Sequence, residues 1–323
     1  MNRQRMAGFP IVVLTLLAPG ASLAQAPIRL AYNFAPGQTM RQVVDASAEG
    51  QLTIEDPGKQ EAPVPFAWKG SETFSARIND VKSDGTATLQ FSLVSLSVDF
   101  KQGDCATSMR AKHGKVVMTA EGVEMSAQPA GRDLFRPVTL RLTSVGVDPD
   151  VKEPPSLSVI KTGVDEVGPD SMVMATALTV GPAPALPLPD HVIKVGDSWS
   201  QNVNASLPNR QIAQGAITYT LLCLERFGAD QVARIGIKGS ARASGVSVAM
   251  TGEPGKADPR PKVTVDEFTQ EIEGTATFLV NKGRLGVIDL TMRLHEMISA
   301  PRPTGVKTAT ITATGKMTVT QTP

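Results

Sequence analysis

The chain has 323 residues, with 32 Lys or Arg against 31 Asp or Glu, so its formal net charge is only +1. This balance, without a basic cluster, excludes the electrostatic surface of a nucleic-acid-binding protein. Only 4% of the residues are aromatic, so the core must consist mainly of aliphatic side chains. Alternating runs of Val, Thr and Ser favour strands over helices, and the length allows one large or two ordinary domains.

The N-terminal region has the pattern of a secretory signal peptide. Arg3 and Arg5 supply positive charge, the apolar run 11–18 is shorter than a membrane-spanning helix, and Ser22 and Ala24 are the small residues that precede a cleavage site. We therefore expect residues 1–24 to be removed and the mature chain to be periplasmic or secreted. The alternative, an uncleaved membrane anchor, would require about 20 apolar residues.

The clearest strand of the first half covers residues 86–100, and its alternation changes phase in the middle. Apolar side chains occupy every second position up to Leu93, and again from Val94 onward. Because a slip of one residue would turn the core face outward, we predict a β-bulge at Leu93–Val94, and bulges bend strands. Shorter strands are expected at 28–34, 74–81, 108–120, 123–127 and 138–145.

Two pairs of segments resemble each other. Residues 36–47 align without a gap on residues 195–206, with identities at Gly37/Gly196, Gln42/Gln201, Val44/Val203, Ala46/Ala205 and Ser47/Ser206. Residues 76–91 align more sparsely on 222–237, with pairs such as Ile78/Leu224, Ala87/Ala233 and Leu89/Ile235. We interpret these similarities as an internal duplication of a β-rich unit.

A proline-rich segment, 182–189, separates the two units, and its composition favours an extended polyproline conformation. The first unit accordingly covers 25–181 and the second 190–323. Residues 169–180 are the one good helix candidate, since a proline and an aspartate begin the segment and a Gly-Pro pair follows it. A strand is the alternative there.

The second unit contains the most persuasive hairpin. Apolar and polar residues alternate over 268–280, Asn281-Lys-Gly283 turns the chain, and the alternation resumes over 288–294. The first of these strands is long for a flat sheet, so we expect it to bend at Gly274. The last segment, 307–319, alternates Thr with small or apolar residues, which leaves a Thr-lined polar face.

Together these patterns predict a mainly β protein. It consists of two similar units of long, curved antiparallel strands, apolar on one face and polar on the other, with at most one or two short helices. The units could form half-barrels or open meander sheets that each wrap a core, or they could combine into one large sheet.

Two cysteines, Cys105 and Cys223, are the one candidate pair for a disulfide. Export would permit a bridge, and it would tie the two halves together if the Cα atoms lay within about 7 Å. Cys223 lies in an apolar run and resembles a small core residue, whereas Cys105 follows a probable turn. We favour two unpaired thiols over a bridge.

No motif for catalysis or for binding a cofactor or a metal is present. His113, His191 and His295 have no neighbours at metal-ligand spacing, and the glycine-rich phosphate loops and the Gly-x-Ser-x-Gly elbow are absent. Carboxylate pairs such as Asp148 and Asp150 lie in expected loops, where solvated acids are commoner than calcium ligands. We therefore expect no catalytic, cofactor-binding or metal-binding residues and a protein that is not an enzyme.

Gly196-Asp-Ser-Trp199 places a serine beside an aspartate, but the first copy has Gly-Gln-Thr-Met40 instead. A turn with a packed Trp explains both versions better than a nucleophile does. Leu-Pro followed by Val195-Gly-Asp-Ser-Trp199, within 186–203, resembles a segment of a poorly characterised family of secreted bacterial β-rich proteins. That resemblance implies the β fold and export, and it implies no activity or functional residues.

We therefore expect an exported periplasmic protein of the envelope that acts through structure or interaction. Its partner would be an unknown envelope protein, docked on a sheet edge or on the Thr-lined final strand. The alternative is a carrier or binding module for a lipid or other hydrophobic small molecule, held on a concave apolar face with adaptable methionines. A second alternative is a hydrolase whose site is assembled from residues distant in sequence.

Overall fold

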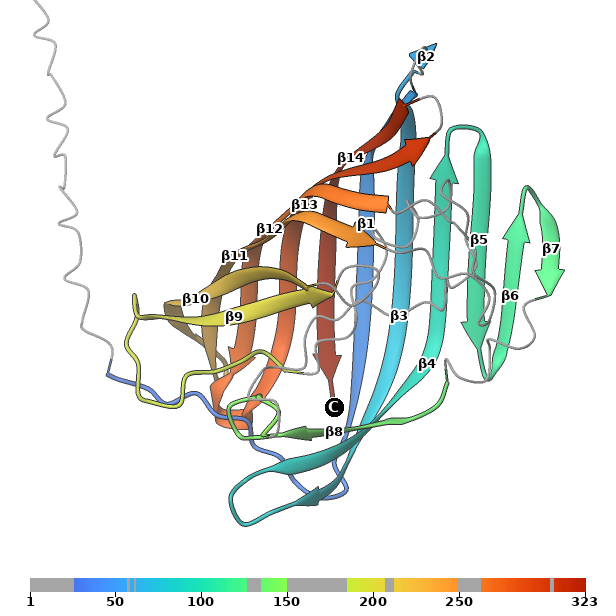
Figure 1. Ribbon diagram of the computed structural model, residues 1–323. Helices are drawn as coiled ribbons and strands as arrows, with labels where there is room; N and C mark the ends of the chain where they lie inside the picture. The colour runs from blue at the N-terminus through green and yellow to red at the C-terminus, as the bar shows by residue number, and fades with distance from the viewer. Residues whose placement is uncertain are drawn as a thin grey trace, which may run out of the picture.

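The computed structural model describes residues 26–56, 59–60, 62–126, 135–149, 185–206, 212–248, 263–302 and 305–323. Over these ranges the chain is almost entirely β-strand, with one short 3-10 helix, η2 (Val280–Lys282), and all the strands belong to a single antiparallel sheet (Figure 1). The predicted mainly β fold is confirmed. The signal peptide and the helix expected at 169–180 lie outside the described residues.

The strands of the first half are β1 (Thr39–Asp56), β2 (Lys59–Gln60), β3 (Val64–Val81), β4 (Ala87–Gln102), β5 (Cys105–Lys112), β6 (Lys115–Ala120), β7 (Val123–Ser126) and β8 (Val138–Leu142). Those of the second half are β9 (Ser198–Ser206), β10 (Ile212–Phe227), β11 (Asp230–Val248), β12 (Val263–Leu279), β13 (Arg284–Arg302) and β14 (Gly305–Thr322).

The first and last long strands are neighbours in the middle of the sheet. From β1 the sheet continues through β3, β4, β5 and β6 to β7, and from β14 through β13, β12, β11 and β10 to β9, while β2 adds to β1 and β8 to β4. The edges are therefore β7 and β9. Of the arrangements that the sequence left open, the structure shows one large sheet, in which each half of the chain forms one wing.

Each long strand separates an apolar inner face from a polar outer face. On β1, Met40, Val44 and Leu52 are buried, while Arg41 and Asp45 are exposed. We call the side that carries the buried residues the inner face. Inner side chains from both wings pack into one hydrophobic cluster. The curvature of the sheet therefore buries its apolar face.

Two segments outside the strands close the lower end of the core (Figure 1). Ile28 and Ile193 form an isolated β-bridge, with N···O distances of 2.8 Å in both directions. The Tyr32 hydroxyl donates to the Leu186 carbonyl oxygen (3.1 Å) and accepts a hydrogen bond from the Leu186 N–H (2.7 Å). The Tyr32 ring also meets Phe278 of β12 edge-on. The described part of the Pro-rich segment is therefore packed into the core.

Tyr32→Phe is expected to lower the free energy of unfolding by about 1–3 kcal/mol, because the buried N–H and C=O of Leu186 lose their partner. Equilibrium denaturation measures this change. Tyr219→Phe is the matched control: Tyr219 is also buried and stacks on Trp199, and no hydrogen bond of its hydroxyl is recorded within the described residues. Equal losses for the two variants would contradict the role given to the Tyr32 hydroxyl.

The bulge predicted at Leu93–Val94 is confirmed. Leu93 pairs with Phe74 of β3 and Ser95 pairs with Thr73, so Val94 is the extra residue on β4. Beyond the bulge the alternation is restored, with Leu96 buried on the inner face. The phase change in the sequence therefore marks the position where the strand bends.

The two segments that align in sequence, 36–47 and 195–206, contain the same turn. Gly37 and Gly196 have positive φ angles of 80° and 94°, a conformation that glycine adopts without steric cost. The N–H of Gly37 donates to the carbonyl oxygen of Ile78 and that of Gly196 to Leu221, each at 2.8 Å. The residue after each glycine then accepts the N–H of the same partner, at 2.9 and 3.0 Å.

These hydrogen bonds correct the sparser of the two alignments at one point. Ile78 corresponds to Leu221, and not to Leu224, because both residues bond to the same turn. The alignment of Leu89 with Ile235 agrees with the structure. Leu89 lies opposite Ile78 in the sheet, and Ile235 lies opposite Leu221. We propose internal duplication as the origin of this correspondence.

Candidate functional site

Both cysteines are free thiols in the structure. Cys105 is exposed at the start of β5, in the wing that ends at β7, whereas Cys223 lies in β10 of the other wing. The Cys223 thiol donates to Glu225 Oε1 at 3.3 Å. Partial burial and this carboxylate raise the pKa of the Cys223 thiol, so the group stays protonated and weakly nucleophilic.

The three histidines are dispersed. His113 occupies the turn between β5 and β6, His191 Nδ1 lies 3.0 Å from Asp190 Oδ1, and His295 Nε2 lies 3.9 Å from Glu267 Oε2. In the part of the chain that the structure describes, no three His, Cys, Asp or Glu side chains come together as a metal site.

The Gly-Asp-Ser-Trp segment is a turn with a packed tryptophan. Asp197 accepts the Lys194 N–H at 2.8 Å, which closes the turn, and the Ser198 hydroxyl shares a hydrogen bond with Thr220 on the neighbouring strand. Trp199 Nε1 donates to the Pro187 carbonyl oxygen at 2.9 Å. Each side chain has a structural partner, and none is arranged as a nucleophile with a base.

The inner face carries two buried carboxyl groups. Glu72 on β3 is 9% exposed and Glu296 on β13 is 1% exposed, and Oε2 of each has no hydrogen-bond partner. Their cross-strand neighbours are apolar: Val44 and Leu96 for Glu72, and Phe268 and Ile311 for Glu296. Burial raises the pKa of both carboxyls from the ordinary 4.5 to about 7, because an apolar environment disfavours the charged form.

The sequence contained the signal for these two acids. Glu72 is in phase with the apolar inner positions Phe74 and Ala76, and Glu296 continues the alternation of Leu294. Extending each period-2 pattern by one step would have placed a carboxyl on the core face.

A groove of about 770 Å³ crosses the outer face of five adjacent strands, β4, β3, β1, β14 and β13. One wall is a cross-strand row in which each residue pairs with the next: Lys101, Ala67, Glu49, Thr314 and Arg293. The other wall contains Pro65, Gln51 and Thr312. The intervening residues direct their side chains inward, so their backbone forms the floor.

The groove is long, and both polar and apolar residues line it. Its volume lies within the usual range for ligand sites, about 300–1,000 Å³. The cations of Lys101 and Arg293 stand at its two ends, separated by four strand spacings or about 19 Å, and Glu49 lies between them. Gln51, Thr312 and Thr314 add groups that both donate and accept hydrogen bonds.

The Thr-lined face predicted for the final strand forms part of this groove. Threonines alternate along β14 with inner residues such as Ile311 and Met317, which are buried. Thr318 also donates to Asp289 Oδ1 of β13 at 2.7 Å. The predicted polar strand is therefore central in the sheet, and its hydroxyl groups face outward.

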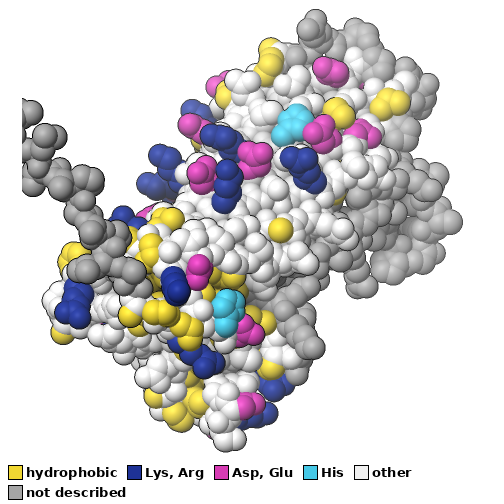
Figure 2. All heavy atoms as spheres, turned by 90° about the vertical axis from the view of Figure 1, so that its left-hand side faces the viewer, with side chains coloured by type: hydrophobic (Ala, Val, Ile, Leu, Met, Phe, Trp, Pro, Cys, Tyr) yellow, Lys and Arg dark blue, Asp and Glu magenta, His cyan; other side chains and the backbone are white. Residues whose placement is uncertain are grey.

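Charged residues continue this polar surface across the other wing. Figure 2 shows basic and acidic side chains interspersed in a band on the side that carries β10 and β11 in Figure 1, with apolar side chains gathered below. Opposite charges are direct cross-strand neighbours at Lys238/Glu273 and at Glu271/Arg293. Such pairs favour the sheet modestly and keep this face compatible with water.

Among the described residues, no helix is long and apolar enough to cross a membrane.

Comparison with known proteins gives only weak likenesses. No family model and no curated protein matches the chain. Among solved structures, an outer membrane channel from Pseudomonas putida F1 is 8% identical, with 90% of this chain and 97% of that chain covered and a TM-score of 0.24. The β domain of the Bordetella autotransporter BrkA is 10% identical, with 87% and 98% covered and a TM-score of 0.20. With scores this low, neither likeness supports a functional argument.

Proposed function

We propose that this chain is an exported, non-enzymatic protein of the bacterial envelope that docks an extended polar segment of a partner protein in the groove across β4, β3, β1, β14 and β13. The groove itself carries the proposal, because it is long, is charged at both ends and presents hydrogen-bonding side chains between them. Export is supported by the signal-peptide pattern at the N-terminus and by the resemblance of residues 186–203 to secreted β-rich proteins.

The charges of the groove indicate which kind of segment fits. Lys101 and Arg293 would pair with acidic side chains near the two ends of the segment, and Glu49 would pair with a basic or hydroxyl side chain between them. An extended chain spans about 19 Å with six residues. Most outer side chains of the long strands are polar, whereas strands that contact lipid direct apolar residues outward. This polarity supports a partner approached through water.

A photo-crosslinking amino acid at Thr312, in the full chain expressed in its own host, tests this proposal. We expect one predominant adduct, and we expect Lys101→Glu combined with Arg293→Glu to remove it. The same amino acid at Thr320, on the same strand and face but outside the groove, is the matched control, and Arg234→Glu controls for the change of charge. Adducts that are equal at both positions, or insensitive to the groove charges, would contradict docking there.

The alternative function, a carrier of a hydrophobic molecule, requires open apolar space on the inner face. At the lower end that face is filled: Tyr32, Leu221, Phe278 and Leu285 are at most 6% exposed within one cluster. This packing supports docking on the outer face in preference to carriage inside. Native mass spectrometry of protein purified from its host distinguishes the two, since a stoichiometric bound lipid would favour the carrier.

A further inference from the structure

A second hollow lies on the outer face of the β7-side wing, away from the groove. It has a volume of about 340 Å³ and is formed by β3, β4, β5 and β6. Three serines and three cations line it: Ser71, Ser95, Ser97, Arg110, Lys112 and Lys115. No acidic residue is among its lining residues, so its charge is strongly positive within a chain that is nearly neutral.

Two local features of the sequence bring these side chains together. The extra residue at Val94 changes which positions of β4 face outward. As a result, the side chains of Ser95 and Ser97 face outward beside the hollow. The expected strand 108–120 is divided into the hairpin β5–β6, because His113 and Gly114 both have positive φ, at 51° and 77°. Two consecutive positive φ angles are typical of a type I′ hairpin turn.

That turn places Lys112 directly opposite Lys115. Cross-strand neighbours of the same charge destabilise a sheet. Within the described residues, neither lysine has a recorded ion pair, and both are exposed. Two unneutralised ammonium groups held side by side are therefore stabilised when an anion lies between them.

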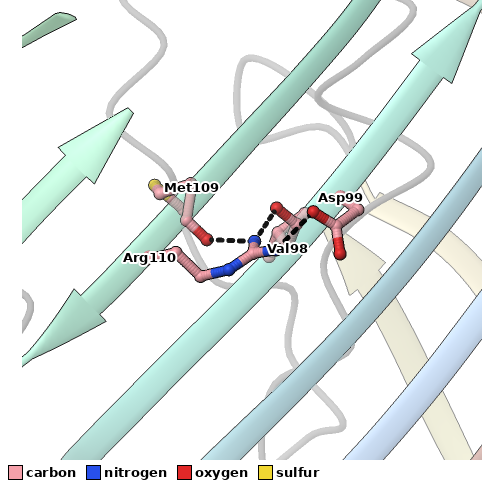
Figure 3. Close-up of polar contacts among 4 residues, drawn as sticks. All are labelled: Val98, Asp99, Met109 and Arg110. Carbon is pink, nitrogen blue, oxygen red and sulfur yellow. Dashed lines mark hydrogen bonds and ion pairs between the residues drawn. The ribbon is translucent and has the colours of Figure 1, made fainter. Parts of the chain in front are cut away.

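Arg110 is held in a fixed position at the same hollow (Figure 3). Its Nη1 donates to the carbonyl oxygens of Val98 (2.7 Å) and Met109 (3.1 Å), and its Nη2 forms an ion pair with Asp99. Asp99 thus balances Arg110 and leaves the two lysines without a counter-charge. These contacts fix the Arg110 guanidinium at the edge of the hollow and leave only its remaining N–H groups for a further acceptor.

We propose that this hollow, lined by Arg110, Lys112, Lys115 and the three serines, binds a phosphate group. A phosphate monoester carries close to two negative charges at neutral pH and presents three acceptor oxygens, which can use several ammonium and hydroxyl donors at once. A carboxylate has less charge and only two oxygens. The phosphate could belong to a free phosphate compound or to the phosphomonoester headgroup of an anionic phospholipid such as phosphatidic acid.

Titration of the mature protein with inorganic phosphate, followed by calorimetry and by amide NMR shifts, tests the proposal. We expect saturable binding that weakens with added salt, and we expect Lys112→Gln with Lys115→Gln to weaken it at least 10-fold. Lys112→Arg with Lys115→Arg is expected to retain binding. Lys238→Gln with Arg242→Gln, on the outer face of β11, is the control and should leave the affinity unchanged.

Flotation with vesicles that contain phosphatidic acid, whose headgroup is a phosphate monoester, compared with vesicles of phosphatidylcholine alone, distinguishes the two sources of phosphate. Binding to the anionic vesicles that free phosphate displaces indicates a lipid headgroup, whereas phosphate binding without flotation indicates a free phosphate compound. No saturable phosphate binding, or binding that the lysine variants leave unchanged, overturns the proposal. The exposed lysines make unfolding a poor explanation, and equal melting temperatures of the variants check this directly.

Discussion

Replacement of Glu72 and Glu296 by glutamine is expected to remove most of the pH dependence of stability between pH 4.5 and 7. Both carboxyls are buried on the inner face without a partner for Oε2, and burial raises the pKa of each to about 7. In the unfolded chain the same groups titrate near 4.5. The folded protein therefore binds these two protons more tightly than the unfolded chain does.

The sign of the effect follows from proton linkage. Below pH 4.5 both states are protonated, and the full stability is present. Between pH 4.5 and 7 the unfolded chain releases the protons while the folded protein retains them, so the free energy of unfolding falls as the pH rises. A difference from 4.5 to about 7 corresponds to a loss of about 3 kcal/mol for each group, and above pH 7 the loss is complete.

Urea denaturation at a series of pH values from 4 to 8.5 measures this slope. The slope is a better readout than the stability at one pH, because a buried glutamine amide also lacks a partner and has its own desolvation cost. Glu271→Gln with Glu273→Gln, two exposed acids on the outer face of β12, is the matched control and should keep the wild-type slope. If Glu72→Gln with Glu296→Gln leaves the slope of the free energy of unfolding against pH unchanged, these carboxyls are hydrated in the folded protein.

The local features of this fold could be predicted from the sequence, because they follow from the alternation of apolar and polar residues along a strand. The bulge at Val94 followed from a change of phase, and the outward threonines of β14 followed from simple alternation. Each of these features depends on residues within one strand. The mainly β fold was predictable for the same reason.

The candidate sites could not be predicted, because they depend on strand order. The groove forms only when β1 lies between β3 and β14, which brings Glu49 beside Thr314. Hairpin rules relate neighbouring strands in the chain, and they contain no information on a pair formed by its first and last long strands. The basic hollow was missed for a smaller reason: Lys112 and Lys115 face each other only because a turn at His113–Gly114 divides the expected strand.

Gly274→Ala is expected to destabilise the protein by about 1–3 kcal/mol or more, because β12 and β13 approach each other closely at this glycine. A Cβ at Gly274 would lie 2.0 Å from the carbonyl oxygen of Asp289 and 2.9 Å from Leu290 Cα. Both obstacles are backbone atoms of β13. Because β13 is also paired with β14 on its other side, it cannot move away without disturbing a second ladder of hydrogen bonds.

Gly236→Ala provides the matched control for this prediction. Gly236 lies in the adjacent strand β11, opposite Thr275. The atoms nearest to a Cβ at Gly236 belong to the exposed side chain of Leu222, the first at 3.2 Å. Both substitutions reduce the conformational freedom of the unfolded chain equally, so the difference between them isolates the steric term. Equal free energies of unfolding for the two variants would mean that β12 and β13 can separate at Gly274 at little cost.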